Sequence, residues 1–270
     1  MNYIESILLA ILQGLTEFLP ISSSGHLVLA EHLLGVKKSG IDFEVFVHFG
    51  TMLSVVLILW KDIFEILRSF FTKIFQFEKL KDNFKSDINF KTAILIIWAS
   101  IPAGVIGVMF EEKIESTFQN PKLTSLFLIV TGIILFSTRF AKNNPDKDFG
   151  FASSFFVGIA QAFAILPGIS RSGTTISAGM IAGINGVKSA RFSFLLSLPA
   201  IFGATLLKTK EIIELSLFDK LPQLLISSAI AFTTGYIAIK FLLKVISRGN
   251  FSLFAYYCVI VGLLGLIFLK

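Results

Sequence analysis

Long stretches without a charged side chain recur along this sequence, and they limit its fold more than any other feature. They occupy residues 92–110, 123–138, 149–170, 172–187, 192–207, 221–239 and 249–269. A helix needs about 20 apolar residues to cross a bilayer. Only 16% of the 270 residues are charged and 54% are hydrophobic, whereas soluble domains carry roughly 25% charged residues. We therefore predict an all-α polytopic membrane protein, which excludes disordered and coiled-coil folds and a nucleic-acid partner.

Two of the apolar segments are interrupted in their middle. The segment 1–35 is broken near Pro20, and the segment 149–187 near Pro167. Broken helices at membrane depth are tolerated only where protein buries them or water fills a cavity. We therefore predict a re-entrant helical hairpin in each segment. Six full spans remain, at about 43–60, 91–110, 122–140, 190–208, 221–243 and 251–269.

Lysine and arginine residues are spread unevenly over the two faces that this topology creates. The loops 61–91, 139–148, 185–191 and 244–250 carry 14 of them, and the opposite face carries 8. Because basic residues concentrate on the cytoplasmic side, we expect both termini outside, the first hairpin opening outward and the second inward. The whole chain, 1–270, then forms a single integral membrane domain.

The loop 61–90 has an amphipathic pattern. Its Phe, Ile and Leu residues recur at spacings of three and four, with Lys and Arg between them. This spacing predicts an amphipathic helix that lies on the cytoplasmic face.

Cysteine and histidine are too few for two kinds of site. Cys258 is the single cysteine, so the chain cannot form an internal disulfide or a thiolate metal cluster. The three histidines are His26, His32 and His48, without an HExxH motif, which argues against a zinc enzyme. We expect His32 and His48 to be packing or interface residues.

The two broken segments match each other at an offset of 148 residues. Gln13 aligns with Gln161, and residues 22–25 align with 170–173. The predicted topology gives the two segments opposite orientations, which is the signature of an inverted repeat. We therefore expect a site where the two breaks meet, near the membrane midplane.

The first break offers a carboxylate, hydroxyls and an imidazole within a short stretch. Gln13 and Glu17 are four residues apart, so they share a helix face. Pro20 should end that helix or mark its break. The turn at 22–25 combines serine hydroxyls, backbone N–H groups and a following helix N-terminus, which suit an anion. His26 follows directly.

The second break repeats this arrangement and adds a cation. Glycines at 168 and 173 allow close approach, and Arg171 lies between two long apolar runs. Its guanidinium presents a fixed fork of donors that matches phosphate oxygens. Two alternatives stay open: Glu17 and Arg171 as a buried ion pair alone, and the serines of the first turn as helix caps.

The motifs QGLTEFLPISSSGH at 13–26 and PGISRSG at 167–173 closely resemble those of the bacitracin-resistance family of undecaprenyl-pyrophosphate phosphatases. The resemblance extends to the separation of the motifs and to the length and hydropathy of the chain. The family pattern begins with Glu or Gln, then three residues, then Glu. Here Gln13 fills the first position, which removes one carboxylate.

The resemblance implies a hydrolase of the bacterial inner membrane that converts undecaprenyl diphosphate to undecaprenyl phosphate and phosphate. That reaction recycles the lipid carrier for peptidoglycan synthesis and cell shape, and confers resistance to bacitracin. The resemblance also implies an inverted repeat with two re-entrant hairpins, a site that opens toward the extracytoplasmic side, and a homodimer.

Functional positions of the family carry over residue by residue. The resemblance gives roles to Glu17, Ser23, His26, Ser170, Arg171 and Thr175. We expect four residues to be catalytic: Glu17, Ser23, His26 and Arg171. We expect the substrate to contact Gln13, Ser22, Ser24, Gly168, Ser170, Ser172, Gly173, Thr174 and Thr175.

The expected chemistry leaves the nucleophile open. Either Ser23 or His26 would attack the terminal phosphorus or activate the water that does. Glu17 would orient or deprotonate that group, or hold a divalent cation such as Mg²⁺ or Ca²⁺; no organic cofactor is expected. Two other functions compete with the enzyme: a polyprenyl-phosphate transporter or flippase that uses the same anion site, and a non-catalytic lipid-binding protein.

Overall fold

A computed structural model describes residues 1–34, 41–142, 144–214 and 220–269. Within these ranges the chain is helical, and the one β-type pairing is an isolated bridge between Asn144 and Ile184. The elements are α1 (Tyr3–Phe18), α2 (Ser23–Leu34), α3 (Ile41–Ile58), α4 (Trp60–Lys73), η1 (Phe77–Lys79), α5 (Leu80–Ser86), α6 (Ile88–Met109), α7 (Glu111–Thr117), α8 (Pro121–Ser137), η2 (Thr138–Phe140), α9 (Phe151–Phe163), α10 (Arg171–Ile181), α11 (Gly186–Glu214), α12 (Leu221–Ser247), η4 (Phe251–Leu253) and α13 (Phe254–Phe268).

Helices cover all six segments that were predicted as spans: α3, α6, α8, α11, α12 and α13. In the described part of the chain, four stretches are long and apolar enough to cross a membrane: Ile88–Met109, Pro121–Phe140, Leu221–Ser247 and Phe251–Phe268. A fifth candidate combines α3 and α4, which meet at a bend of 84°. The prediction of an all-α membrane protein is therefore confirmed.

The two predicted hairpins are helix–break–helix units. Helices α1 and α2 enclose the first break, and α9 and α10 enclose the second. The end of the first hairpin, at residue 35, lies outside the described residues.

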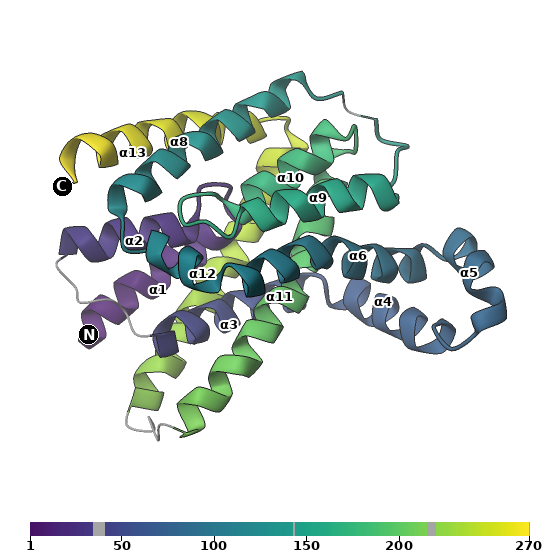
Figure 1. Cartoon of the computed structure of the whole chain (residues 1–270), viewed down its shortest axis with the longest axis horizontal. Helices are drawn as coiled ribbons and strands as arrows, with labels where there is room; N and C mark the ends of the chain where they lie inside the picture. The colour runs from purple at the N-terminus through teal and green to yellow at the C-terminus, as the bar shows by residue number, and fades with distance from the viewer. Residues whose placement is uncertain (35–40, 143, 215–219, 270) are drawn as a thin grey trace.

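Each hairpin packs against helices from the other half of the chain. Helix α1 packs on α12, whereas α9 packs on α6. Helices α8 and α13, each the last long helix of its half, pack along each other, as Figure 1 shows. The two halves therefore exchange partners, and neither hairpin is held mainly by its own half.

Small residues allow this close packing. A Cβ on Gly14 of α1 would lie 2.7 Å from the Ala231 carbonyl oxygen of α12, and a Cβ on Gly158 of α9 would collide with the Ala99 carbonyl oxygen of α6. Helices in membranes associate through such small residues, because lipid supplies no hydrophobic force between them. The two glycines therefore set how closely the hairpins approach their supports.

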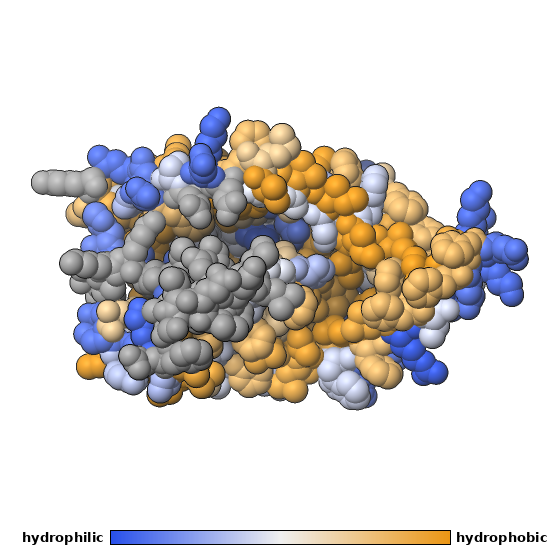
Figure 2. All heavy atoms as spheres, turned by 60° about the horizontal axis from the view of Figure 1, so that its bottom comes forward, coloured by the Kyte–Doolittle hydropathy of each residue, from blue (hydrophilic) through white to orange (hydrophobic). Residues whose placement is uncertain are grey.

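The outer surface is largely apolar. Figure 2 shows hydrophobic side chains across the middle and right of one face, with hydrophilic side chains gathered toward the two ends. Large apolar side chains such as Ile133, Ile237 and Ile260 are more than half exposed. A belt of this kind suits contact with lipid, since its helices satisfy their own backbone groups.

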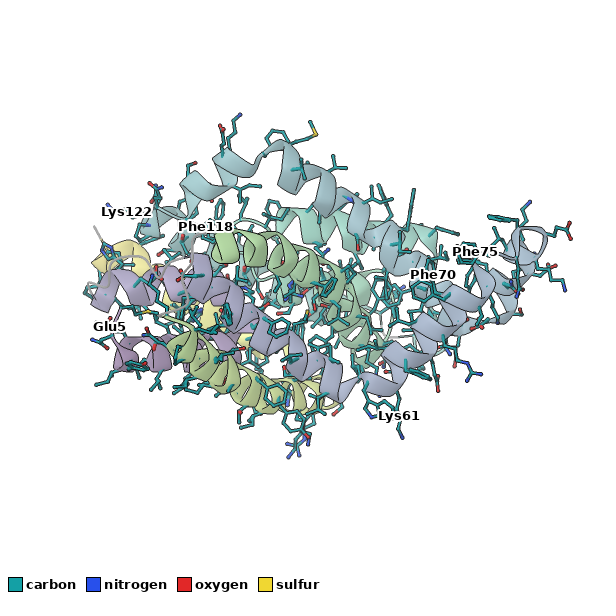
Figure 3. The ribbon with its side chains drawn as sticks, turned by 90° about the horizontal axis from the view of Figure 1, so that it is seen from below. Glu5, Lys61, Phe70, Phe75, Phe118 and Lys122 are labelled. Carbon is teal, nitrogen blue, oxygen red and sulfur yellow. The ribbon has the colours of Figure 1, made fainter. Side chains whose placement is uncertain are left out.

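The segment 61–90 folds differently from the single amphipathic helix that its spacing suggested. It forms two helices, α4 and α5, joined through η1, and both pack against α6. Helix α4 keeps an exposed apolar face that includes Trp60, Phe64 and Phe71. Figure 3 places Phe75 of this segment at the end of the molecule opposite Glu5 and Lys122.

Asp87 joins this segment to α6. Its carboxylate accepts from the backbone N–H groups of Asn89 and Phe90 at 2.8 and 3.1 Å, which caps the helix. It also pairs with the Lys73 ammonium and accepts from the Ser69 hydroxyl. Burial alone would raise the pKa of Asp87, but these partners outweigh it and hold that pKa below its ordinary value. The cap therefore stays ionised.

Candidate active site

The first break turns sharply between α1 and α2. Helix α1 ends at Phe18, and the cap residue Leu19 is already extended, as Pro20 requires of the residue before it. Ser22 then adopts a left-handed backbone with φ of 69°, which is uncommon for a residue with a side chain. Its Oγ accepts from the Gly25 N–H at 3.2 Å.

The second break repeats the same hydrogen bonds at an offset of 148 residues. Ser170 Oγ accepts from the Gly173 N–H at 3.0 Å. The hydroxyls of Ser22 and Ser24 are 3.3 Å apart, as are those of Ser170 and Ser172. The sequence repeat is therefore also a repeat of local structure.

The two turns touch each other. A Cβ on Gly25 would lie only 3.0 Å from the Gly168 Cα. The Ser172 hydroxyl donates to the Leu19 carbonyl oxygen at 3.1 Å. Gly168 has φ of 94°, a conformation that glycine adopts at little cost. The starts of α2 and α10 consequently converge on one place.

Glu17 is at the centre of this junction. It is buried, and its Oε2 accepts from the Ser23 hydroxyl at 2.5 Å and from the Gln13 amide Nε2 at 2.9 Å. Its Oε1 pairs with the Arg171 guanidinium. Three residues predicted as catalytic, Glu17, Ser23 and Arg171, therefore form one hydrogen-bonded group from both breaks.

His48 is a further member that sequence reasoning missed. Its Nε2 lies 3.6 Å from Glu17 Oε2, and its side chain is 33% exposed. Its Nδ1 lies 2.8 Å from the Glu44 carbonyl oxygen, one helical turn earlier on α3. We expected a packing or interface residue at this position, and only the packing of α3 brings His48 to Glu17.

The hydrogen-bond partners of the His26 ring differ from those of Glu17. Its Nδ1 lies 2.8 Å from the Ser22 carbonyl oxygen, and its Nε2 lies 2.9 Å from the Tyr257 hydroxyl of α13. Because a carbonyl oxygen only accepts, Nδ1 carries the proton, and Nε2 accepts from Tyr257. The two rings are stacked, with centroids 5.6 Å apart. No signal in the sequence marks Tyr257, which lies within an apolar run.

The other predicted contact residues surround the second turn. Thr175 donates to the Arg171 carbonyl oxygen at 2.7 Å, and its hydroxyl lies 2.7 Å from that of Ser193. Thr131 of α8, also missed, accepts from the Ser170 N–H at 3.0 Å and donates to the Gly168 carbonyl oxygen at 2.8 Å. The second turn is therefore supported by neighbouring helices on two sides.

Some buried polar atoms have no hydrogen-bond partner within the described part of the chain. They include Gln13 Oε1, Gln161 Oε1 and Thr174 Oγ1. The two glutamines are counterparts in the repeat, and both leave the same atom unpaired. Gln13 lies beside Glu17 with its amide nitrogen toward the carboxylate, so its oxygen would face the site only with the amide turned over.

This arrangement suits an anion with several oxygens. The first N–H groups of a helix have no intrahelical partner, and both α2 and α10 begin here with these groups and the positive end of the helix dipole. The guanidinium of Arg171 has five N–H donors, and its bond to Glu17 comes from Nη2, so other donors can bind phosphate oxygens. The junction can therefore hold a phosphate group next to a hydroxyl that is bonded to a carboxylate.

We predict that Thr131→Val destabilises the protein. The change keeps the shape of the side chain but leaves the buried Ser170 N–H without an acceptor, which costs about 1–3 kcal/mol. Thermal unfolding in detergent measures this loss. Thr233→Val on α12, where the hydroxyl bonds only to its own helix, is the matched control, and equal midpoints for the two variants would contradict the role of Thr131.

Comparisons with known proteins show the family of the chain. A family model described as bacitracin resistance protein BacA matches residues 6–264. An undecaprenyl-diphosphatase of Salinibacter ruber is 41% identical over 268 residues, covering 98% of this chain and 99% of the relative. One of Halothermothrix orenii is 42% identical, covering 99% and 98%, and one of Methanobrevibacter smithii is 41% identical, covering 98% and 96%. The chain therefore belongs to the bacitracin resistance protein BacA family.

Proposed function

We propose that this protein hydrolyses undecaprenyl diphosphate to undecaprenyl phosphate and phosphate. The activity supports recycling of the lipid carrier for cell-wall synthesis and resistance to bacitracin. The relatives named undecaprenyl-diphosphatase span nearly the whole chain, and the apolar helices suit a lipid substrate within a membrane. The protein then acts in the bacterial inner membrane.

One observation carries the chemistry: the Ser23 hydroxyl donates to Glu17, and Glu17 pairs with Arg171. A hydroxyl becomes a useful nucleophile when an adjacent base takes its proton. Glu17 supplies that base, and Arg171 supplies a positive charge for the phosphate oxygens. Binding of an anion alone would need neither the carboxylate nor the aligned hydroxyl.

Ser23 is the better candidate for the nucleophile. Its oxygen is 2.5 Å from the carboxylate oxygen. Both nitrogens of His26 are engaged, with the Ser22 carbonyl oxygen and the Tyr257 hydroxyl. His26 would have to lose one of these bonds before it could attack phosphorus, whereas Ser23 needs only to transfer its proton to Glu17.

The reaction then proceeds in two steps. The Ser23 oxygen attacks the terminal phosphorus while its proton passes to Glu17, and the anhydride P–O bond breaks to release undecaprenyl phosphate. Water next attacks the phosphoserine; the proton on Glu17 returns to the Ser23 oxygen as the Ser23–phosphorus bond breaks, one water proton stays on the departing phosphate, and the other passes to solvent. Arg171 and the N–H groups at the starts of α2 and α10 stabilise the charge on the transferred phosphoryl group in both steps.

A divalent cation, Mg²⁺ or Ca²⁺, fits this site only through a mixed set of ligands. The described residues contain no cluster of three His, Cys, Asp or Glu side chains that could hold a metal ion. Glu17 would share a cation with Gln13 and His48, because the unpaired Gln13 oxygen reaches the carboxylate if its amide is turned over. A bound cation would neutralise charge on the phosphate oxygens.

Substitution of the central residues tests the proposed activity. We expect Glu17→Ala, Ser23→Ala and Arg171→Ala each to lower kcat at least about a thousandfold, because each removes a group that acts on the transferred phosphoryl group. The measurement is phosphate release from undecaprenyl diphosphate by detergent-solubilised protein.

Arg68→Ala on the exposed face of α4 is the control for loss of a positive charge, and it should keep the activity of the wild type. Because flipping needs a bilayer, release in detergent separates a phosphatase from a transporter. Equally slow release by wild-type and Arg171→Ala protein would contradict the proposal.

A second carboxylate should strengthen cation binding. We expect Gln13→Glu to raise the affinity for Ca²⁺ at least about tenfold, since the number of charged ligands sets affinity for hard cations. Isothermal titration calorimetry with CaCl₂ measures the change without substrate. Gln161→Glu is the matched control, because Ile165 stands where the first motif has Glu17. Equal affinities of wild-type and Gln13→Glu protein would rule out a cation at this position.

We further propose that the chain is an inverted repeat, a single membrane domain with six spans and two re-entrant hairpins, 1–35 and 149–187. The exchange of partners between the two halves supports this topology. The start of α1 and the end of α13 lie at one end of the molecule, and α4 and α5 lie at the other (Figure 1). With the excess of basic residues on the α4–α5 side, we infer that the termini lie outside and the amphipathic segment 61–90 lies in the cytoplasm. We further propose that the active site opens toward the extracytoplasmic side.

Cysteine labelling in intact cells checks this orientation. On a Cys258→Ser background, we expect Lys122→Cys to react with a membrane-impermeant maleimide and Asp146→Cys to stay protected until the cells are lysed. Both positions are exposed in the structure, so protection reports the membrane rather than burial. The reverse pattern would overturn the orientation.

A further inference from the structure

We propose that Tyr257 is a positioning residue of the active site, which acts through His26 to hold the turn that carries Ser23. The inference rests on the proposed function, since it takes Ser23 as the nucleophile. Tyr257 lies on α13, outside both motifs. This role therefore adds α13 to a site that the sequence assigns to the two hairpins alone.

A chain of two hydrogen bonds connects α13 to the turn. The Tyr257 hydroxyl donates to His26 Nε2 at 2.9 Å, and His26 Nδ1–H donates to the Ser22 carbonyl oxygen at 2.8 Å. The nearly parallel stacking of the two rings, with an interplanar angle of 7°, fixes the imidazole further. Because Ser22 directly precedes Ser23 in the chain, a fixed Ser22 carbonyl fixes the position from which the Ser23 side chain leaves the backbone.

The turn needs such support because its backbone is unfavourable. Ser22 has a positive φ of 69° although it carries a side chain. Such conformations persist only where the surrounding structure imposes them. The Gly25 N–H holds the Ser22 side chain from within the turn, and His26 holds its carbonyl group. Tyr257 in turn decides which way the His26 ring faces.

A second contact from α13 reaches the other end of the same turn. The thiol of Cys258, the residue after Tyr257, donates to the Pro20 carbonyl oxygen at 3.5 Å, and this side chain is fully buried. Helix α13 otherwise packs along α8. Two consecutive residues of α13 therefore support the first turn, Cys258 at Pro20 and Tyr257 through His26 at Ser22. Two such contacts indicate more than the chance approach of one tyrosine.

The second turn is likewise supported by the last long helix of the other half, α8. Thr131 of α8 bonds to the Ser170 N–H and the Gly168 carbonyl oxygen. Helices α8 and α13 pack along each other and occupy corresponding positions as the last long helices of their halves. Each turn is therefore supported by a hydroxyl from the last long helix of the other half. Thr131 of α8 bonds directly to the backbone of the second turn. Tyr257 of α13 acts on the first turn through His26.

Removal of one oxygen atom tests the proposal. Tyr257→Phe keeps the stacked ring and deletes only the hydroxyl, so we expect kcat for undecaprenyl diphosphate to fall about tenfold while KM stays within about twofold. Tyr256→Phe, on the same helix but packed against Phe136, is the matched control and should match the wild type. Equal kcat values for the two variants would overturn the role of Tyr257.

A double-mutant cycle separates positioning from general damage to the fold. If Tyr257 acts through His26, Tyr257→Phe should add no more than about a twofold loss once His26→Gln is present. A full additional tenfold loss would mean that Tyr257 acts by another route and would contradict the proposal.

Nitrogen NMR of protein labelled with ¹⁵N-histidine tests the bond without any substrate. We expect the wild-type His26 signals to report a proton on Nδ1 and a hydrogen-bonded Nε2, and we expect the Nε2 signal to shift in Tyr257→Phe. The His26→Gln variant assigns these signals. An unchanged Nε2 signal would overturn the inference even if hydrolysis is confirmed, whereas a shifted signal in a protein without hydrolysis would count against the proposed function alone.

Discussion

The pairing of Glu17 with Arg171 is the interaction on which the rest of this structure depends. An unpaired charge in an apolar membrane domain is costly, and a buried ion pair is tolerated only where further hydrogen bonds complete it. Here Ser23 and Gln13 complete the shell of the carboxylate. The two partners come from different breaks, 154 residues apart in the chain. The pair can therefore exist only when both hairpins are folded and in contact.

The contact between the turns follows from the same requirement. A Cβ on Gly25 would lie only 3.0 Å from the Gly168 Cα, so a side chain there would push the turns apart, whereas a Cβ on Gly168 would collide with the Thr124 carbonyl oxygen of α8. Each turn uses a serine to bond the N–H three residues later, so the backbone at the start of each helix is set locally. Local geometry is thus repeated in the two halves, while the charges are divided, with the acid in the first half and the arginine in the second.

Much of the site could be predicted from sequence because its main residues lie within two short motifs at a constant offset. Glu17, Ser23 and Arg171 interrupt an apolar background in which any ionisable side chain is conspicuous. His48, Thr131 and Tyr257 could not be found in this way, since each comes from a separate helix and reaches the turns only through tertiary packing. The division of the segment 61–90 into two helices was likewise hidden, because the amphipathic spacing continues through residues 74–79, between α4 and α5.

The exchange of helices between the halves has a consequence for biosynthesis. Helix α1 packs on α12, which begins more than 200 residues later in the chain. Because proteins are made from the N-terminus, α1 must wait in the membrane or at the translocon until almost the whole polypeptide has been inserted. During that interval Glu17 has no arginine partner, and the small residues that will meet α12 face lipid or other proteins. The first half therefore cannot reach its final packing before the second half is inserted. Factors that shield polar groups in partly inserted chains should then raise the yield of active protein.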